Sequence, residues 1–279
     1  MPIPKPFLQL MHKPPQIKFF KIFKRLSKQE QLAGLDKIHQ ANTNALSTLR
    51  AKQQSLPNTW TVVSWNANSV RERHREKSFE KILQDTDADV FFIFEAKTSL
   101  KKFLGKQGVR ALLRKHQLTH RFEHISTIKP AIHGYAGVII LSKHKPTKIE
   151  IGINNHTLDK EGRCLTIHFP HITITGVYLP NSGNLTELTH LDKKILYTEK
   201  LEKFCSHNSK IDWPYLLLGD MNIAPLNGSK FGGALQPNNA SHPSCHEKER
   251  ISFSKLTSTL RLSDQIEKFG NKNSRGSGI

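Results

Sequence analysis

Cysteine is scarce in this sequence. The three cysteines, Cys164, Cys205 and Cys245, are widely spaced and odd in number, and no Cys-x-x-Cys pair occurs. This pattern argues against a disulfide scaffold and a zinc ribbon, and it favours a reducing compartment inside the cell. The nearest approach to a zinc set is His242, Cys245 and His246, which we interpret as a loop. We therefore expect an intracellular protein, in the nucleus of a eukaryote or in the cytoplasm or nucleoid of a bacterium.

Long apolar runs are also lacking. The longest runs, such as Val90 to Phe94, have the size of a strand, whereas a helix needs about 20 apolar residues to cross a bilayer. A membrane-spanning helix is therefore excluded. The composition, with 37% hydrophobic and 23% charged residues, is typical of a globular protein, and 279 residues suffice for a sizeable core.

Acidic residues are few relative to basic ones. The chain has 42 Lys and Arg but only 23 Asp and Glu, which gives a formal net charge of +19. Such a surplus predicts a polyanionic partner, and nucleic acid is the commonest one. Charge alone is equally compatible with a basic protein that performs no chemistry.

The chain divides into three parts. Residues 1–58 are a basic extension with ten Lys and Arg against Glu30 and Asp36, and we expect it to be partly disordered or helical. Its segment 17–26 alternates apolar and basic clusters, yet it resembles secretory or organelle targeting signals only weakly. Residues 59–269 alternate strand-like and helix-like patterns. Residues 270–279 are polar and rich in Gly and Ser, which predicts a frayed tail.

The middle part predicts an α/β fold. Runs rich in β-branched and aromatic residues predict strands at 60–65, 89–94, 137–141, 164–169, 172–178 and 215–218. Apolar residues at helical spacing predict helices at 76–84, 109–117, 188–204 and 247–260. Such a mixture is typical of sheets covered by helices.

Polar residues follow three of the predicted strands: Asn66 and Asn68, then Glu95, then Asp220 and Asn222. Loops at strand ends bring such groups together in sheet-centred folds. Carboxylate and amide oxygens are hard ligands that suit Mg²⁺. Taken singly, each of these residues is more often a turn former than a catalytic group.

Seven short segments, taken together, favour a catalytic role for these residues over a role in turns. In chain order they read SWNANSVR at 64–71, DVFFIFEAK at 89–97, GYAGV at 134–138, EGR at 161–163, YLPNSG at 178–183, GDMNIA at 219–224 and ER at 249–250. Each is weak alone, but chance would have to supply both their sequence and their order. The set resembles the exonuclease III class of apurinic/apyrimidinic (AP) endonucleases, with Phe94 and Ala96 in place of the usual Gln and Thr. The resemblance covers about residues 59–269.

The resemblance implies a fold and an activity. The fold is a four-layered α/β sandwich of the DNase I type, two sheets flanked by helices. The activity is hydrolysis of double-stranded DNA on the 5′ side of abasic sites, as in base excision repair, with Mg²⁺ or alternatively Mn²⁺. A 3′→5′ exonuclease or 3′-phosphodiesterase activity sometimes accompanies it. We expect a monomer.

Site residues also follow by position. The implied metal-site residues are Asn66, Glu95, Asp220 and Asn222. The implied catalytic residues are Tyr178 as an active-site phenol, Asp220 as the group that orients or deprotonates water, and Asn222 as a donor to the phosphate. The implied DNA-binding residues are Asn68, Arg71, Lys97, Tyr135 and Asn181. The structural alternatives are a core role for Tyr178 and a turn role for Tyr135, and for Arg163 we favour a structural role as a buried pair with Glu161 or a neighbouring residue.

One departure from the family pattern affects the expected activity. The family ends with an Asp-bearing strand and a Ser-Asp-His loop whose His contacts the scissile phosphate. Here no histidine follows His246, and Ser263-Asp264-Gln265 fits the family's helix-end Asp instead. We therefore expect the domain to be incomplete at its C-terminus and the chain to be a weak or inactive nuclease, because loss of one phosphate donor costs about 10²–10³ in rate.

Two other readings remain open. A retrotransposon-type endonuclease shares several of these motifs and would cleave intact, T-rich duplex rather than abasic DNA. A catalytically silent DNA-binding module would keep the positive charge and show salt-dependent DNA binding without cleavage.

Overall fold

The computed structural model describes residues 59–127, 135–183, 188–209, 214–224 and 243–263, together with Gln40 and Thr43. The chain separates into two compact units, residues 1–58 and 59–279. Gln40 and Thr43 are helical; the remainder of the predicted extension, and the predicted tail at 270–279, lie outside the described residues. Within the described part, no helix is long and apolar enough to span a membrane.

The first sheet has four strands in the order β1-β2-β4-β3. Their bounds are β1 Val62–Asn66, β2 Val90–Phe94, β3 His120–His124 and β4 Val138–Ser142. β1 and β2 are parallel, with Asn66 beside Phe94, whereas β4 is antiparallel to both β2 and β3. The carboxyl ends of β1 and β2 therefore meet at one edge of the sheet.

The second sheet repeats this arrangement in the order β5-β6-β7-β8. Its strands are β5 Lys148–Ile151, β6 Cys164–Phe169, β7 Ile172–Tyr178 and β8 Tyr215–Asp220. β5, β6 and β7 pair antiparallel, and β8 joins β7 in parallel, with Tyr178 beside Asp220. Here too, two parallel strands end side by side.

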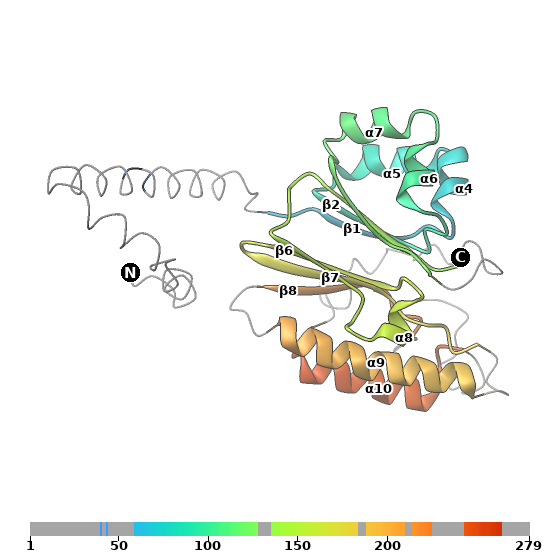
Figure 1. The fold of residues 1–279 in the computed structure, drawn as a ribbon. Coiled ribbons are helices and arrows are strands. Elements are labelled where there is room, and N and C mark those ends of the chain that lie inside the picture. Colours follow the sequence, from blue (N-terminus) through green and yellow to red (C-terminus); the bar gives the residue numbers. More distant parts are fainter. Residues whose placement is uncertain are drawn as a thin grey trace, which may run out of the picture. The chain divides into compact units, whose positions relative to one another are not determined.

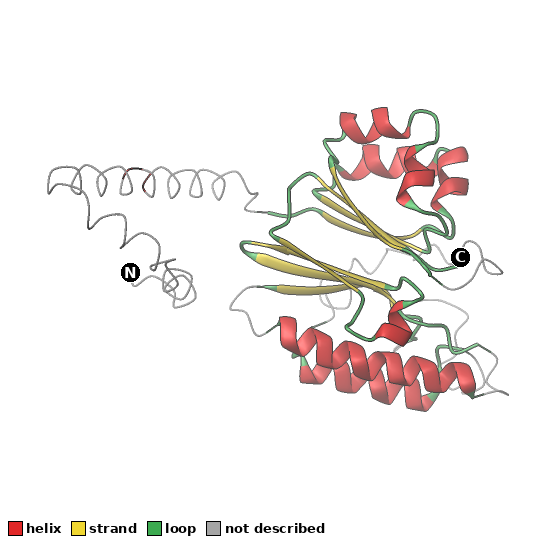
Figure 2. Cartoon of the chain, in the orientation of Figure 1, coloured by secondary structure: helices red, strands yellow, loops and turns green. Residues whose placement is uncertain are grey.

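Helices cover the outer face of each sheet (Figure 1). The first sheet carries α4 Val70–Arg75, α5 Ser78–Thr86, α6 Leu100–Leu104 and α7 Val109–Lys115. The second carries the long α9 Thr189–Asn208 and α10 Glu247–Thr259, with the short α8 His156–Asp159 near one end. Figure 2 shows the resulting order of layers, helix, sheet, sheet, helix. The predicted four-layered α/β sandwich is confirmed.

β2 shows why these layers form. All five of its residues are buried. Phe91 and Ile93 point into the core beneath α4–α7, whereas Val90, Phe92 and Phe94 point into the core between the sheets. A strand that is buried on both faces needs a continuous apolar run rather than an alternating one.

The sheets approach closely at Gly176 of β7. A Cβ atom there would lie 2.2 Å from Cδ1 of Phe92 in the opposite sheet. Glycine is therefore required for the two sheets to pack at this distance. The contact also helps to fix the ends of β2 and β7 relative to each other, and the candidate site lies at those ends.

Candidate active site

Four strand ends converge on the candidate site. Asn66 is the last residue of β1 and Glu95 follows β2 directly; Tyr178 and Asp220 are the last residues of β7 and β8. Two pairs of parallel strands, one in each sheet, thus direct their carboxyl ends to the same place. In α/β proteins, binding sites commonly lie at the carboxyl ends of strands.

Asn66 connects the two sheets. Its Nδ2 donates to Oε1 of Glu95 and to Oδ2 of Asp220, both at 2.8 Å. Its Oδ1 accepts the backbone N–H of Asn68 at 3.0 Å. The amide of Asn66 therefore joins the carboxylate of Glu95 in the first sheet to that of Asp220 in the second, which lies 154 positions after Asn66 in the chain. In this arrangement Asn66 aligns the two carboxylates through its nitrogen.

Glu95 is held in its ionised form. Burial raises its pKa, but hydrogen bonds from Asn66, Lys97 and Tyr178 outweigh burial and leave the pKa below its usual value. Nζ of Lys97 lies 3.0 Å from Oε2 of Glu95 and also donates to Oδ1 of Asn68. The carboxylate is 18% exposed, so it remains accessible to a ligand.

The backbone around Glu95 is strained and tied down. Glu95 and Lys97 have φ of +47° and +50°, in the left-handed region. Backbone hydrogen bonds secure both sides of this turn, from Ser69 N to Glu95 O at 2.8 Å and from Ala96 N to Gly137 O at 3.0 Å. Strain of this kind persists only where neighbours hold it, and it clusters at functional sites.

Tyr178 shares a cluster with Arg163 and Tyr135. The Arg163 guanidinium lies 4.7 Å from the centre of the Tyr178 ring and 5.1 Å from that of Tyr135. It donates to Tyr135 Oη, to Tyr178 O and to the buried carboxylate of Glu161. The predicted Arg163–Glu161 pair is confirmed. Tyr178 also hydrogen-bonds Glu95; burial and that charge raise its pKa well above the usual value, so its phenol stays protonated.

Asp220 and Asn222 are arranged by a tight turn after β8. The Asn222 N–H donates to Oδ1 of Asp220 at 2.9 Å, while its Nδ2 donates to Leu179 O at 2.8 Å. The turn thus ties β8 to the segment after β7. Asn222 has a φ of +48°, a conformation that Asn tolerates better than most residues.

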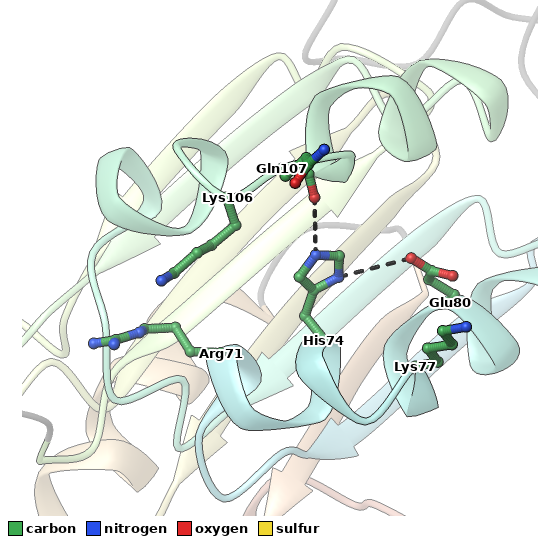
Figure 3. Close-up of a pocket in the computed structure, with 6 residues that line it drawn as sticks. All are labelled: Arg71, His74, Lys77, Glu80, Lys106 and Gln107. Atoms are coloured by element: carbon green, nitrogen blue, oxygen red, sulfur yellow. Dashed lines mark hydrogen bonds and ion pairs between the residues drawn. The ribbon is translucent and has the colours of Figure 1, made fainter.

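Two predicted DNA-binding residues, Asn181 and Arg71, have contacts other than with Asn66, Glu95 or Asp220. Asn181 uses its Oδ1 to accept the N–H of Gly183 at 2.8 Å. Arg71, at the start of α4, lines a pocket with His74, Lys77, Glu80, Lys106 and Gln107 (Figure 3). His74 is oriented there by Gln107 O at 3.1 Å and by Glu80 at 4.0 Å. The pocket is basic, because three of its side chains are Lys or Arg.

The donor chemistry of the site fits a divalent cation. Among the described residues no group of three or more His, Cys, Asp or Glu side chains gathers in a metal-binding cluster. Mg²⁺ does not need one, since it keeps several waters and binds through one or two carboxylates plus substrate phosphate. Glu95 and Asp220, bridged by Asn66, supply two such carboxylates.

Two buried residues close to the site were missed by the sequence reasoning. Lys194 of α9 and Glu249 of α10 form an ion pair beneath Asn222. The only sequence signal was that Glu249 lies in one of the seven segments. Lys194 carried none, because a lysine in a helix is usually exposed.

Comparison with known proteins gives concordant matches. A model of the endonuclease/exonuclease/phosphatase family matches residues 63–265. An exodeoxyribonuclease from Streptococcus pneumoniae is 30% identical over 210 residues, 72% of each chain. An AP endonuclease structure from Archaeoglobus fulgidus has a TM-score of 0.58 at 21% identity and covers 72% of this chain and 70% of its own. A 3′ phosphatase from Neisseria, solved with a product DNA hairpin, has a TM-score of 0.58 at 22% identity and covers 72% and 71%.

Proposed function

We propose that this chain is a DNA repair nuclease, because it belongs to the endonuclease/exonuclease/phosphatase family. Within that family it belongs to the exonuclease III and AP endonuclease group. The observation that carries the proposal is the link from Asn66 to Glu95 and Asp220. It brings together three of the residues that the family resemblance implies for the active site, from strands that are far apart in the chain.

The finer proposal is cleavage 5′ to abasic sites in duplex DNA with Mg²⁺. Glu95 and Asp220 would hold the cation, with Asn66 aligning them, and bound Mg²⁺ would polarise the non-bridging oxygens of the phosphate. Asp220 is also the candidate base that orients the attacking water. Its Oδ1 and Oδ2 are both fixed by hydrogen bonds, to the Asn222 N–H and to Asn66, which restricts the direction of its remaining lone pairs.

Tyr178 is suited to donate a hydrogen bond as a neutral phenol rather than to transfer a proton. Its raised pKa keeps the phenol protonated at neutral pH, and a phenol can donate a hydrogen bond to a phosphate that gains negative charge in the transition state. Asn222 is the second candidate donor. Both side chains are positioned by contacts to other residues before any substrate binds, as electrostatic preorganisation requires.

The DNA backbone would be bound by groups around this centre. Lys97 and Asn68 form a pair on one side, and Tyr135 rests on Arg163 on the other. The basic pocket that contains Arg71 and Lys106 extends the positive surface along α4 and the turn after α6. Backbone contacts of this kind position a duplex without reading its sequence.

A nicking assay tests the proposal. A fluorescently labelled duplex with one tetrahydrofuran abasic site is incubated with excess chain and either Mg²⁺ or EDTA. We expect a single Mg²⁺-dependent nick 5′ to the abasic site. Glu95→Gln and Asp220→Asn should abolish it, whereas Asp85→Asn, a matched change at an exposed residue of α5, should not.

Other outcomes select the competing functions. Cleavage of an intact T-rich duplex in preference to the abasic one would replace the proposal with a retrotransposon-type endonuclease. Salt-dependent binding without a nick, even at single-turnover concentrations, would leave a DNA-binding module. Equal cleavage by wild type and by Asp220→Asn would refute the assignment of the site.

A further inference from the structure

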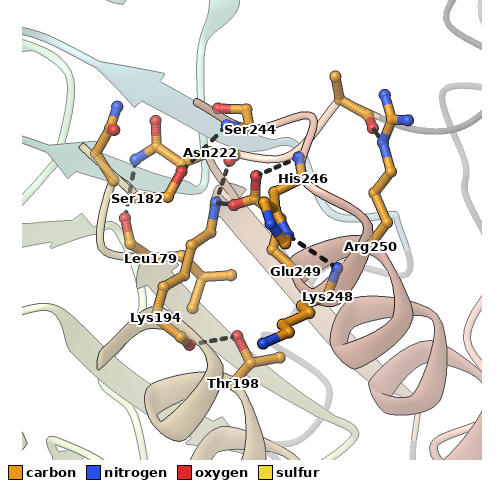
Figure 4. A network of polar contacts seen from close by, with 12 residues as sticks. Leu179, Ser182, Lys194, Thr198, Asn222, Ser244, His246, Lys248, Glu249 and Arg250 are labelled. Carbon is orange, nitrogen blue, oxygen red and sulfur yellow. Dashed lines mark hydrogen bonds and ion pairs between the residues drawn. The ribbon is translucent and has the colours of Figure 1, made fainter. Parts of the chain in front are cut away.

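A fully buried ion pair lies beneath the turn that carries Asn222 (Figure 4). Nζ of Lys194 on α9 is 2.6 Å from Oε2 of Glu249 on α10. The two side chains are 0% and 1% exposed. Removing both charges from water is costly, and packing two helices together does not require it, since apolar side chains of similar size serve as well or better. The pair therefore needs a reason other than helix packing.

The reason lies in a third contact of the ammonium. Lys194 also donates to the backbone carbonyl of Asn222. The N–H of Asn222 donates to Asp220 and its side-chain amide donates to Leu179 O. The Lys194 ammonium thus holds the carbonyl of Asn222. The N–H of Asn222 fixes Asp220, and its side-chain amide fixes the loop after β7.

Glu249 is itself anchored by the first turn of α10. Its Oε1 accepts the N–H of His246 at 2.9 Å, which completes the cap of the helix. The next residue, Arg250, donates from Nε to the carbonyl of Ala224 at 3.0 Å. The start of α10 therefore holds segment 221–224 twice, once directly and once through Lys194.

We infer that Lys194, kept in place by Glu249, is a positioning residue that fixes Asn222 and, through it, Asp220. The inference rests on the proposed nuclease function of that site. Lys194 touches no reacting group; it acts through the backbone of the turn. Its loss should misplace the water-orienting carboxylate without removing any group that binds DNA.

The test uses two double variants. Lys194→Met with Glu249→Leu fills the same space without charge, so α9 and α10 should stay packed. Lys194→Glu with Glu249→Lys keeps a buried pair but moves the ammonium to the other helix, away from the Asn222 carbonyl. We expect kcat to fall 10- to 100-fold in both, as for other groups that orient catalytic ligands, with KM for abasic duplex within threefold of wild type. Lys203→Met, on the exposed face of α9, is the matched control.

A second readout is independent of activity. Amide hydrogen exchange at 222–224 should be at least tenfold faster in the Met/Leu variant, while amides within α9 and beyond the first turn of α10, whose cap Glu249→Leu removes, keep their protection. If wild type cleaves nothing, the proposed function fails, and this exchange measurement still decides whether Lys194 holds the turn. Wild-type kcat in either folded double variant, or unchanged exchange at 222–224, would overturn the inference. If the Met/Leu variant does not fold, the variant Lys194→Glu with Glu249→Lys is judged by the same two measurements, kcat and amide exchange at 222–224.

Discussion

Arg163→Lys is the most informative single substitution in this domain. It keeps the positive charge but removes the planar guanidinium, whose N–H donors can bind several acceptors at once. Lysine is not equivalent to arginine where such multiple donation is used. The guanidinium reaches Glu161, Tyr135 and Tyr178 at once, and it is 1% exposed. A lysine ammonium at this position can keep the Glu161 contact, but we expect it to lose the two tyrosine contacts.

The size of the loss follows from those contacts. Two hydrogen bonds from a charged donor are worth about 1.5–3 kcal/mol each, and the ring contacts add about 0.5–1 kcal/mol each. The Glu161 contact is kept and adds nothing to the loss, so at the lower end of these ranges we expect about 4 kcal/mol of lost stability. In a domain of about 150–250 residues, each kcal/mol lowers Tm by about 2–4 °C, which gives a drop of about 8–16 °C.

The assay is a thermal melt followed by circular dichroism, together with nicking of abasic duplex below the lowered Tm. Because the Tyr178 backbone and ring lose their partner, we expect kcat to fall in the folded variant as well. Arg110→Lys is the control, since Arg110 is exposed and its Nε donates to the backbone carbonyl of Leu104. A Tm within about 1 °C of wild type would refute the argument that the Arg163 guanidinium positions both tyrosines.

Three further outcomes are expected. Gly176→Ala should lower stability by about 1–3 kcal/mol through overpacking between the sheets, seen in urea melts, whereas Gly105→Ala, where a Cβ would lie 3.5 Å from its nearest neighbours, should be close to neutral. Burial raises the pKa of Glu161, but its Lys and Arg partners outweigh burial and leave the pKa below its usual value. The stabilisation from Glu161 is therefore present above the ordinary glutamate pKa of about 4.3 and is lost as the pH falls, so the Tm difference between wild type and Glu161→Gln should shrink between pH 6 and 3. Arg71→Gln with Lys106→Gln should weaken DNA binding and reduce the slope of log K against log salt by about 1–2, measured by fluorescence anisotropy.

The core strands were predictable because their burial leaves a clear signal. The predicted runs 164–169 and 172–178 match β6 and β7 residue for residue. The strands that were missed, β3 with HRFEH and β5 with KIEI, lie at the outer edges of their sheets. Edge strands are half-exposed and carry charged side chains, so their composition does not differ enough from that of a loop.

The site was predictable at its strand ends and not beneath them. Asn66, Glu95 and Asp220 each follow an apolar run, which marks them in the sequence, and their approach is confirmed by the hydrogen bonds of Asn66. Lys194 and Glu249 lie in helices, 55 positions apart. Apart from the segment that contains Glu249, nothing local distinguishes them from exposed charges, because their burial depends on how α9 packs against α10.

The left-handed residues show why the arrangement, and not the residue types alone, makes the site. Asn68, Glu95, Lys97, Ala136 and Asn222 all have φ between +42° and +50°. Each such residue other than glycine costs about 1 kcal/mol or more, with Asn among the cheapest. Isolated segments would relax to ordinary conformations. The left-handed turns are held because Lys97 N bonds Ala136 O at 3.0 Å and Ser69 N bonds Glu95 O at 2.8 Å, contacts between segments that meet only once β1, β2 and β4 of the first sheet have paired. The same folding step that buries β2 therefore also sets the direction of the Glu95 carboxylate.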